Sequence, residues 1–248
     1  MHHDAFAILD ALKSTLDEHR PLAPDLFRSL RKDIVLRYTY HSNAIEGNPL
    51  TLTETKVVLE DGLTIGGKLL RHHLEVVNHA EAITHLEDLA KKNVLLDESG
   101  LKDLHQLVLR GLDNEAGRYR CCNVIISGAG HTPPDHHLVD ERMQNFFDWY
   151  RGEAQKLHPV ERAARVHADL VIIHPFRDGN GRTSRLAMNL EIMLAGFPTA
   201  IIPVEDRVAY YQNLDKAGTD IDYGPFVQQL GQLVERSFEP YWYLLGIA

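Results

Sequence analysis

Two helical patterns meet at the sequence HPFRDGNGRTSR, residues 174–185. Upstream, the apolar run Val171-Ile172-Ile173 closes one pattern, and Pro175 stops it because proline lacks a backbone N–H donor. Downstream, leucines recur at helical spacing from Leu186 to Leu194 until Gly196 ends the pattern. Asp-Gly and Asn-Gly are strong turn dipeptides, so the stretch predicts a tight glycine turn that leads directly into a helix N-terminus.

Such a turn makes a binding site for an anion. The first N–H groups of a helix have no partner within the helix, and the helix dipole favours negative charge beside them. Gly179 and Gly181 would let a phosphate approach the backbone without a Cβ in the way. Arg182 and Arg185 share one helical face, and each offers a planar fork for phosphate oxygens. Two arginines in a first turn oppose the helix dipole, a local conflict that is typical of functional sites.

Two further side chains of the stretch suit phosphate chemistry. Asp178 could hold Mg²⁺, which takes few carboxylates and completes its shell with substrate phosphates. His174 could accept a proton near neutral pH. A glycine turn between helices is usually only a turn, and a lone histidine at a helix end is usually structural or exposed. The combination of histidine, aspartate, glycines and arginines in one short stretch favours a site for nucleotide phosphates.

Around this stretch the chain is mostly helical by pattern. Apolar residues at helical spacing predict helices at about 5–19, 25–44, 51–62, 69–92, 100–112, 138–151, 160–173, 182–195, 206–217 and 223–245. Thr51 to Glu54 has the capping-box pattern that opens the third helix. The β-branched segment Asn123 to Ser127 is the one good signal for a strand or hairpin. We expect one compact all-α domain with a small hairpin, in which residues 1–50 form N-terminal helices and residues 51–248 the core.

The bulk composition limits the class of protein. The chain has 248 residues, of which 44% are hydrophobic and 25% charged, as in soluble globular proteins that bury a core. Its net charge of −9 argues against a nucleic-acid partner, and no apolar run approaches the roughly 18 residues of a membrane span. The start, Met1 to Asp4, lacks the pattern of a secretory signal. The only cysteines are the neighbours Cys121 and Cys122, which favours a reduced, cytoplasmic location.

Residues His174 to Arg185 resemble the motif of Fic domains, His-Pro-Phe-x-Asp-Gly-Asn-Gly-Arg-x-x-Arg, at every fixed position. A match of this length is highly specific, and the resemblance extends from about Tyr38 to the last helix. Fic domains are all-helical with a small β-hairpin flap, in agreement with the elements predicted above. Most known members transfer AMP from ATP to a Ser, Thr or Tyr hydroxyl of a target protein, so the resemblance implies a protein adenylyltransferase.

The resemblance also implies a role for each residue of the site. His174 would be the general base for the target hydroxyl, and Asp178 would bind the Mg²⁺ that bridges the ATP phosphates. The other nucleotide contacts would come from the loop, the helix start, the flap that docks the target as an added strand, and a tyrosine pair beside the adenine: Gly179, Asn180, Gly181, Arg182, Thr183, Ser184, Arg185, Ile126, Ser127, Tyr210 and Tyr211. The chain departs from some relatives at Gly218, where they have an Asn near the base, and this makes base recognition less secure.

A second match lies upstream, at Ser42-Asn43-Ala44-Ile45-Glu46-Gly47. It resembles the inhibitory motif of Fic proteins, Ser/Thr-x-x-x-Glu-Gly/Asn. A glutamate in the last turn of a helix is usually solvated and is mildly unfavourable there. In the proteins it resembles, this Glu pairs with the second motif arginine, here Arg185, and one guanidinium cannot serve a carboxylate and the γ-phosphate together. The resemblance therefore implies intramolecular inhibition through Ser42, Glu46 and Gly47.

Three functions stay open at this point. The first is an autoinhibited adenylyltransferase with ATP and a target protein as partners. The second is a phosphodiesterase that removes AMP at the same site, because in some relatives the inhibitory Glu positions the attacking water. The third is a nucleotide-sensing interaction module with little turnover, against which the complete motif argues. A homodimer is a further arrangement to test, since relatives often form dimers.

The remaining histidines offer a competing interpretation, a metal site. They occur as His72-His73, His136-His137 and the pair His167 and His174, without the spacing His-Glu-x-x-His. We expect scattered surface histidines instead.

Overall fold

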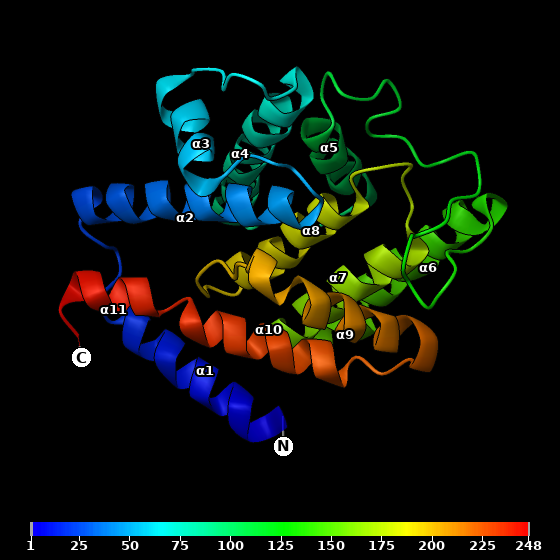
Figure 1. Ribbon diagram of the computed structural model, residues 1–248. Coiled ribbons are helices and arrows are strands. Elements are labelled where there is room, and N and C mark those ends of the chain that lie inside the picture. Colours follow the sequence, from blue (N-terminus) through cyan, green and yellow to red (C-terminus); the bar gives the residue numbers. More distant parts are fainter. Residues whose placement is uncertain (1, 248) are drawn as a thin grey trace.

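The computed structural model describes residues 2–247, and its regular structure is helical (Figure 1). The helices are α1 (His2–Asp17), α2 (Pro24–Ile45), α3 (Leu52–Lys56), η1 (Val57–Asp61), α4 (Leu70–Lys91), α5 (Glu98–Val108), η2 (His136–Leu138), α6 (Val139–Arg151), η3 (Glu153–Lys156), α7 (Pro159–Ile173), α8 (Asn180–Leu194), η4 (Val204–Asp206), α9 (Arg207–Asp220), α10 (Gly224–Arg236) and α11 (Glu239–Leu245). Within residues 2–247 no strand is present, which confirms the all-α class. None of these helices is both long and apolar enough to cross a membrane.

Helices α7 and α8 form the centre of the molecule (Figure 1). On one side they join a core with α4, α5 and α6, to which α8 contributes Leu186 and Leu190. On the other side they join a second core with α1, α9 and α10, to which α8 contributes Met188 and Ile192. Because α8 is buried on both faces, its N-terminus and the loop before it are held in a fixed place.

Helix α2 packs on α4 and α8 (Figure 1). Its last residue, Ile45, is fully buried in the second core. Glu46 follows directly as the C-cap, so the packing of one isoleucine fixes where the next side chain points.

The predicted helices form near their expected bounds, with two differences. The capping box is present: Thr51 Oγ1 accepts from the Glu54 N–H at 3.2 Å, and Glu54 Oε2 accepts from the Thr51 N–H at 2.8 Å. The helix after it changes to a π-helix, η1, before Gly62 ends it in the left-handed region. The prediction of a single helix at 223–245 was wrong. The segment forms two helices, because α10 ends at Arg236 and α11 begins at Glu239. Pro240 lies in the first turn of α11 and lacks the N–H that would continue the bonds of α10.

The strand expected at Asn123 to Ser127 does not form either. We call residues 121–135 the flap. Within the described part of the chain, the only backbone turn bond near its tip runs from the Ala129 N–H to the Ile126 carbonyl, at 3.2 Å. A returning strand would have to pair through Pro133 and Pro134, and proline has no N–H to donate. The flap is therefore a loop whose ends are held by side chains.

Candidate functional site

The loop between α7 and α8 is braced from inside. Asn180 bonds twice to Phe176: Oδ1 accepts from the Phe176 N–H and Nδ2 donates to the Phe176 carbonyl, both at 2.9 Å. The Phe176 ring is buried and stacks on His105 with ring centroids 3.7 Å apart. His105 in turn donates from Nε2 to the Asp178 carbonyl at 2.9 Å and accepts the Gly117 N–H at Nδ1 at 2.8 Å. The side chain of Asn180 thus shapes the loop, which leaves the backbone amides to face a ligand.

A carboxylate already lies at the start of α8. Gly179 is the N-cap, with φ of 73°, a conformation that favours glycine. A Cβ on Gly181 would collide with the Glu46 carboxylate, so only glycine fits there with Glu46 in place. The side chain from the end of α2 therefore occupies the position where an anion is expected from the helix dipole.

Arg185 holds this carboxylate from a fully buried position. Its NH2 donates to Glu46 Oε1 and to the Ser42 carbonyl, each at 2.8 Å, and its Nε donates to Ser42 Oγ at 3.0 Å. Its NH1 donates to the Tyr210 hydroxyl at 3.3 Å. Burial disfavours the charge, but the Glu46 carboxylate and the Tyr210 hydroxyl outweigh it, and the pKa of Arg185 is raised. Four of the five N–H donors of the guanidinium are used in these bonds.

Arg182 is buried but poorly partnered. Its side chain is 3% exposed, and its Nε and NH1 make no hydrogen bond among the described residues. The nearest acids are Glu75 and Asp178, each 3.6 Å away. Asp178 itself is 57% exposed at the mouth of the loop, and its Oδ1 accepts the Gly179 N–H at 2.6 Å. Buried donors without partners mark a place where an anion would be bound.

His174 has the geometry of a proton acceptor. It caps α7 in the left-handed region, with φ of 50° and ψ of 58°. Nδ1 donates to the Val171 carbonyl at 3.3 Å, so Nε2 carries the free lone pair. Burial, the largest cause, lowers the pKa of His174 below its ordinary value. The imidazole is therefore neutral near pH 7, as a base must be.

His174 faces a cavity of about 320 Å³. The flap covers one side, α9 the other, and the start of α8 closes the end. Its lining residues are Glu46, Ile126, Ser127, Gly128, Ala129, His131, Val171, His174, Gly181, Arg207, Tyr210, Tyr211, Leu214 and Asp215. This volume falls in the range of small-molecule sites, which start at about 300 Å³.

Comparison with known proteins identifies the family. The profile described as Fic/DOC family matches residues 95–192. The solved structure of Fic-1 from Caenorhabditis elegans is 34% identical, with a TM-score of 0.87, and the match covers 98% of this chain and 72% of that chain. The chain belongs to the Fic/DOC family.

Other members are similarly close. A Fic domain-containing signaling protein from Bacteroides thetaiotaomicron is 29% identical with a TM-score of 0.87, over 98% of this chain and 99% of that one. The protein adenylyltransferase Fic of Nematostella vectensis is 39% identical over 213 residues, 85% of this chain and 49% of the relative. For protein adenylyltransferase fic-1 of Caenorhabditis elegans the identity is 38% over 218 residues, 86% of this chain and 42% of the relative. The chain thus spans less than half the length of these two relatives.

The Fic cavity unites part of the residues predicted for the site. It includes Glu46, Ile126, Ser127, His174, Gly181, Tyr210 and Tyr211. Asp178, Arg182 and Arg185 lie just before or within the first turns of α8 but are not among the residues that line the cavity. Thr183 and Ser184 are buried, and the Ser184 hydroxyl donates to the Gly181 carbonyl at 3.0 Å. Of the Fic motif, His174 and Gly181 therefore line the cavity. Arg182 and Arg185 follow Gly181 in the first turns of α8.

Arg120 joins the flap to the Fic loop, and no pattern in the sequence had marked it as a site residue. Its buried guanidinium donates to three carbonyls: that of His174 at 2.8 Å, that of Cys122 at 3.0 Å and that of Pro134 at 2.5 Å. The Arg120 N–H donates to the Pro175 carbonyl at 2.9 Å. One side chain therefore ties both ends of the flap to the backbone of the histidine.

The expectation of surface histidines was wrong for two of them. His73 is buried, and its Nε2 accepts the Ile65 N–H at 2.8 Å. His167 is fully buried, and burial lowers its pKa to about 3, so its Nε2 accepts from the Tyr210 hydroxyl at 2.8 Å. His136 and His137 lie with Asp135 at the end of the flap, where their ligand atoms are within 4.8 Å of one another. They are far along the chain from the Fic motif and line no part of its cavity.

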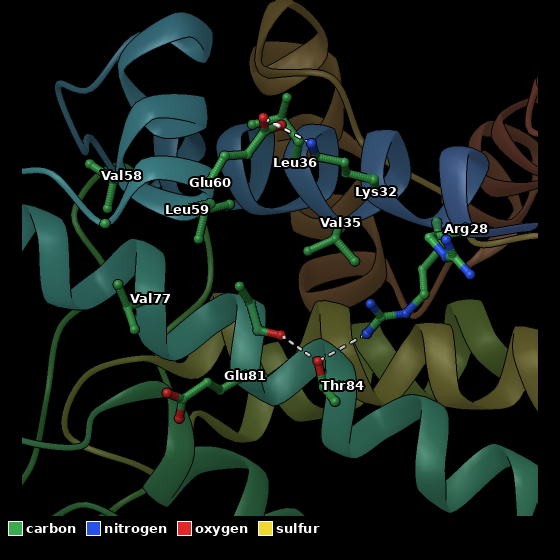
Figure 2. A pocket seen from close by; sticks show the side chains of 13 residues that line it. Arg28, Lys32, Val35, Leu36, Val58, Leu59, Glu60, Val77, Glu81 and Thr84 are labelled. Carbon is green, nitrogen blue, oxygen red and sulfur yellow. Dashed lines mark hydrogen bonds and ion pairs between the residues drawn. The ribbon is translucent and has the colours of Figure 1, made fainter. Parts of the chain in front are cut away.

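A larger cavity, of about 710 Å³, lies between α2, η1 and α4 (Figure 2). Its floor is formed by apolar side chains such as Val35 and Leu59, and Lys32 pairs with Glu60 at 3.0 Å across it. None of its lining residues belongs to the Fic motif or to Ser42–Gly47. The size of a cavity therefore does not locate the site. The smaller cavity is the one that His174, Gly181 and Glu46 line.

Proposed function

We propose that this chain is an autoinhibited protein adenylyltransferase, which moves AMP from ATP to a Ser, Thr or Tyr hydroxyl of a target protein. The observation that carries the proposal is the free Nε2 of His174 on the same cavity as Gly181, at the positive end of α8. The names of the Nematostella and Caenorhabditis relatives support the same activity.

The chemistry needs a base and an anion site side by side. His174 Nε2 takes the proton of the target hydroxyl as its oxygen attacks the α-phosphorus of ATP. The new O–P bond forms, the bond from the α-phosphorus to the bridging oxygen breaks, and pyrophosphate leaves. The amides of Gly179 to Gly181 would hold the phosphates, with Arg182 and Arg185 on the outer ones. Burial around His174 keeps it unprotonated for this task.

Mg²⁺ is the cation we propose for this site, with Asp178 as its protein ligand. The Asp178 side chain is exposed toward the loop mouth, and of its oxygens Oδ1 is engaged by the Gly179 N–H. Mg²⁺ typically takes one or two carboxylates and fills its shell with phosphate oxygens and water. Bound there, it would neutralise the charge of the leaving pyrophosphate.

Inhibition follows from the contacts of Glu46. Its carboxylate accepts from Arg185 at 2.8 Å and lies against Gly181, the position proposed for phosphate. ATP would have to take both the space and the guanidinium from Glu46 before its α-phosphate could face the base. Ser42 adds two bonds to the same guanidinium, and Gly47, with φ of 90°, lets the chain turn away after Glu46.

The reverse reaction is the second candidate. Glu46 lines the same cavity as His174, and its side chain is one-third exposed, at 33%. A carboxylate in that position could orient a water toward the phosphorus of an AMP-modified side chain. This geometry favours a phosphodiesterase as the alternative to transfer.

The flap is proposed as the dock for the target protein. Ile125 is 88% exposed on an irregular segment whose backbone forms no ladder within the described residues. An extended peptide could add to it as a strand, with main-chain bonds for affinity.

We further propose a homodimer, because Leu63, Leu69 and Leu70 are each at least 60% exposed before and at the start of α4. The free, exposed Cys121 and Cys122 support a reducing compartment, the cytoplasm.

One experiment separates these functions. The chain and its Glu46→Gly and His174→Ala variants are incubated with ATP labelled on the α-phosphate and a cell lysate, and labelled bands are analysed by mass spectrometry. Transfer predicts label on protein with Glu46→Gly and none with His174→Ala. Loss of label from a modified protein, dependent on Glu46, supports AMP removal instead. ATP binding without either reaction would leave a nucleotide-sensing module and overturn the proposed enzyme.

A further inference from the structure

Within the described residues, His131 is the flap histidine that lines the Fic cavity. Its side chain is 7% exposed, and neither ring nitrogen makes a hydrogen bond among the described residues. The next histidine along the chain, His136, lies just past the flap and bonds to Asn123. A buried imidazole without partners costs stability unless something that binds there later completes its bonds.

Gly218 of α9 makes room for this ring. A Cβ on Gly218 would come within 2.8 Å of the His131 Cγ and Nδ1 and within 3.2 Å of its Cβ. The glycine lies in a helix, where glycine is less favourable than alanine, and its backbone needs no left-handed conformation. The absence of a side chain at 218 therefore leaves the space that the His131 ring occupies in the lining of the Fic cavity.

Asp215 supplies a second polar group beside the ring. One turn before Gly218 on α9, its Oδ1 accepts the Gly130 N–H at 2.9 Å and lies 3.4 Å from His131 Nδ1. A carboxylate at that distance favours the tautomer with the proton on Nδ1, so Nε2 becomes an acceptor. Oδ2 of Asp215 is an acceptor as well. His131 Nε2 and Asp215 Oδ2 thus form an edge of the cavity that can accept hydrogen bonds but not donate them.

We propose that His131 and Asp215 read the exocyclic amino group of the nucleobase, and that Gly218 is required to seat His131 there. An acceptor edge matches a base that presents N–H donors, as the 6-amino group of adenine does. It opposes a base with an oxo group in that position, because two acceptors then face each other and stay unpaired. This inference rests on the proposed function, since it concerns the base of the nucleotide that the Fic site binds.

ADP and IDP test the edge directly, because their bases differ at position 6, amino against oxo. Neither has a γ-phosphate, so their binding does not compete with Glu46 for Arg185 through that group. Calorimetry on the full chain with Mg²⁺ should give ADP an affinity about tenfold or more above that of IDP. His131→Leu keeps the bulk of the ring and should cut the preference for ADP about three- to tenfold. His137→Ala, an exposed histidine two residues past Asp135, is the matched control and should leave the ratio unchanged.

Asp215→Asn is the most discriminating variant, because it should change which nucleotide is preferred. The amide oxygen can keep the Gly130 N–H, and the amide NH₂ then replaces Oδ2 with a donor. The preference should move toward IDP. Gly218→Ala should reduce the preference as His131→Leu does, because the new methyl displaces the ring. Added to His131→Ala, where there is no ring to displace, it should have little further effect.

The outcomes separate the two levels of the argument. Strong ADP binding with a ratio that ignores His131→Leu, Asp215→Asn and Gly218→Ala would overturn the base-reading role and leave the Fic nucleotide site intact. If neither nucleotide binds to the wild-type chain, the proposed function itself is overturned. A fall in thermal stability with His131→Leu, at an unchanged ratio, would make the ring a packing residue only.

Discussion

Replacing Glu46 with glycine should raise AMP transfer, including self-modification. The substitution removes one bond, from Arg185 NH2 to Glu46 Oε1 at 2.8 Å, and clears the space against Gly181. Arg185 keeps its bonds to Ser42 and Tyr210, so the guanidinium stays near its present position and becomes available to a γ-phosphate. The fold should persist, because the fully buried Ile45 anchors the end of α2.

The size of the gain follows from that one contact. A hydrogen bond to a charged group is worth about 1.5–3 kcal/mol, which corresponds to about tenfold to a hundredfold in rate. The Glu46 side chain is 33% exposed, and solvent weakens an ion pair at such a position, so the lower half of the range is expected. Glu46→Gln keeps the size and an acceptor but loses the charge, and should give a smaller gain. Ser42→Ala removes only the Nε contact and should raise transfer about two- to tenfold.

The assay is initial-rate labelling from ATP labelled on the α-phosphate, at matched protein concentration. The gain must depend on Arg185: combining Arg185→Lys with Glu46→Gly should erase most of it, whereas independent effects would add. A circular-dichroism melt of each variant controls for folding, because Arg185 is fully buried. If Glu46→Gly leaves transfer unchanged and abolishes AMP removal, Glu46 serves the reverse reaction. No change in either activity would refute the inhibitory role of the contact.

Three further outcomes are expected. His174→Ala should reduce transfer by about 10²–10⁴-fold and spare ATP binding. In the wild-type chain, the transfer rate should fall only when the pH drops below the ordinary pKa of histidine. The reason is that burial lowers the pKa of His174, and the base stops working when Nε2 is protonated. A pH–rate profile that breaks above that range would contradict this. Asp178→Ala should lose activity that moderate excess Mg²⁺ does not restore; unchanged metal dependence, measured by titration, would locate the metal elsewhere. Arg120→Met should lower both the melting temperature and kcat, with Arg120→Lys intermediate, because lysine keeps the charge but cannot reach three carbonyls at once; a variant with a normal kcat would show that the flap needs no such tie.

The helical pattern and the Fic stretch were accessible from the sequence because both depend on local rules. Periodicity predicted the helices, and the glycine turn before Leu186 predicted the exposed start of α8. The flap was predicted wrongly as a strand, since β-branched residues signal extension but not a partner, and the prolines at 133 and 134 remove the partner. The break between Arg236 and Glu239 was missed because the apolar spacing continues across it.

Two kinds of site residue had no local signal. Arg120 bonds to backbone carbonyls, and every residue carries one, so no side-chain pattern marks its partners. His131 reaches the cavity only because Gly218, far along the chain, leaves space for it. Glu46 differs: its pairing with Arg185 was expected from the resemblance to the inhibitory motif, and the distance of 2.8 Å now gives that pairing a geometry.

Under the proposed function, Arg185 makes regulation and nucleotide binding parts of one event. Its guanidinium touches the end of α2 through Ser42 and Glu46, and α9 through Tyr210, whose hydroxyl also bonds to the neutral His167. Helix α8 is packed on both faces, so it cannot shift to present the arginine differently. Any exchange of Glu46 for a phosphate must therefore occur by movement of side chains at the mouth, while Arg185 NH1 keeps its contact with Tyr210 on the wall of the Fic cavity. If a ligand bound beside Tyr210 changes the free energy of the Arg185–Glu46 contact, linkage requires that this contact changes the affinity for the ligand by the same free energy.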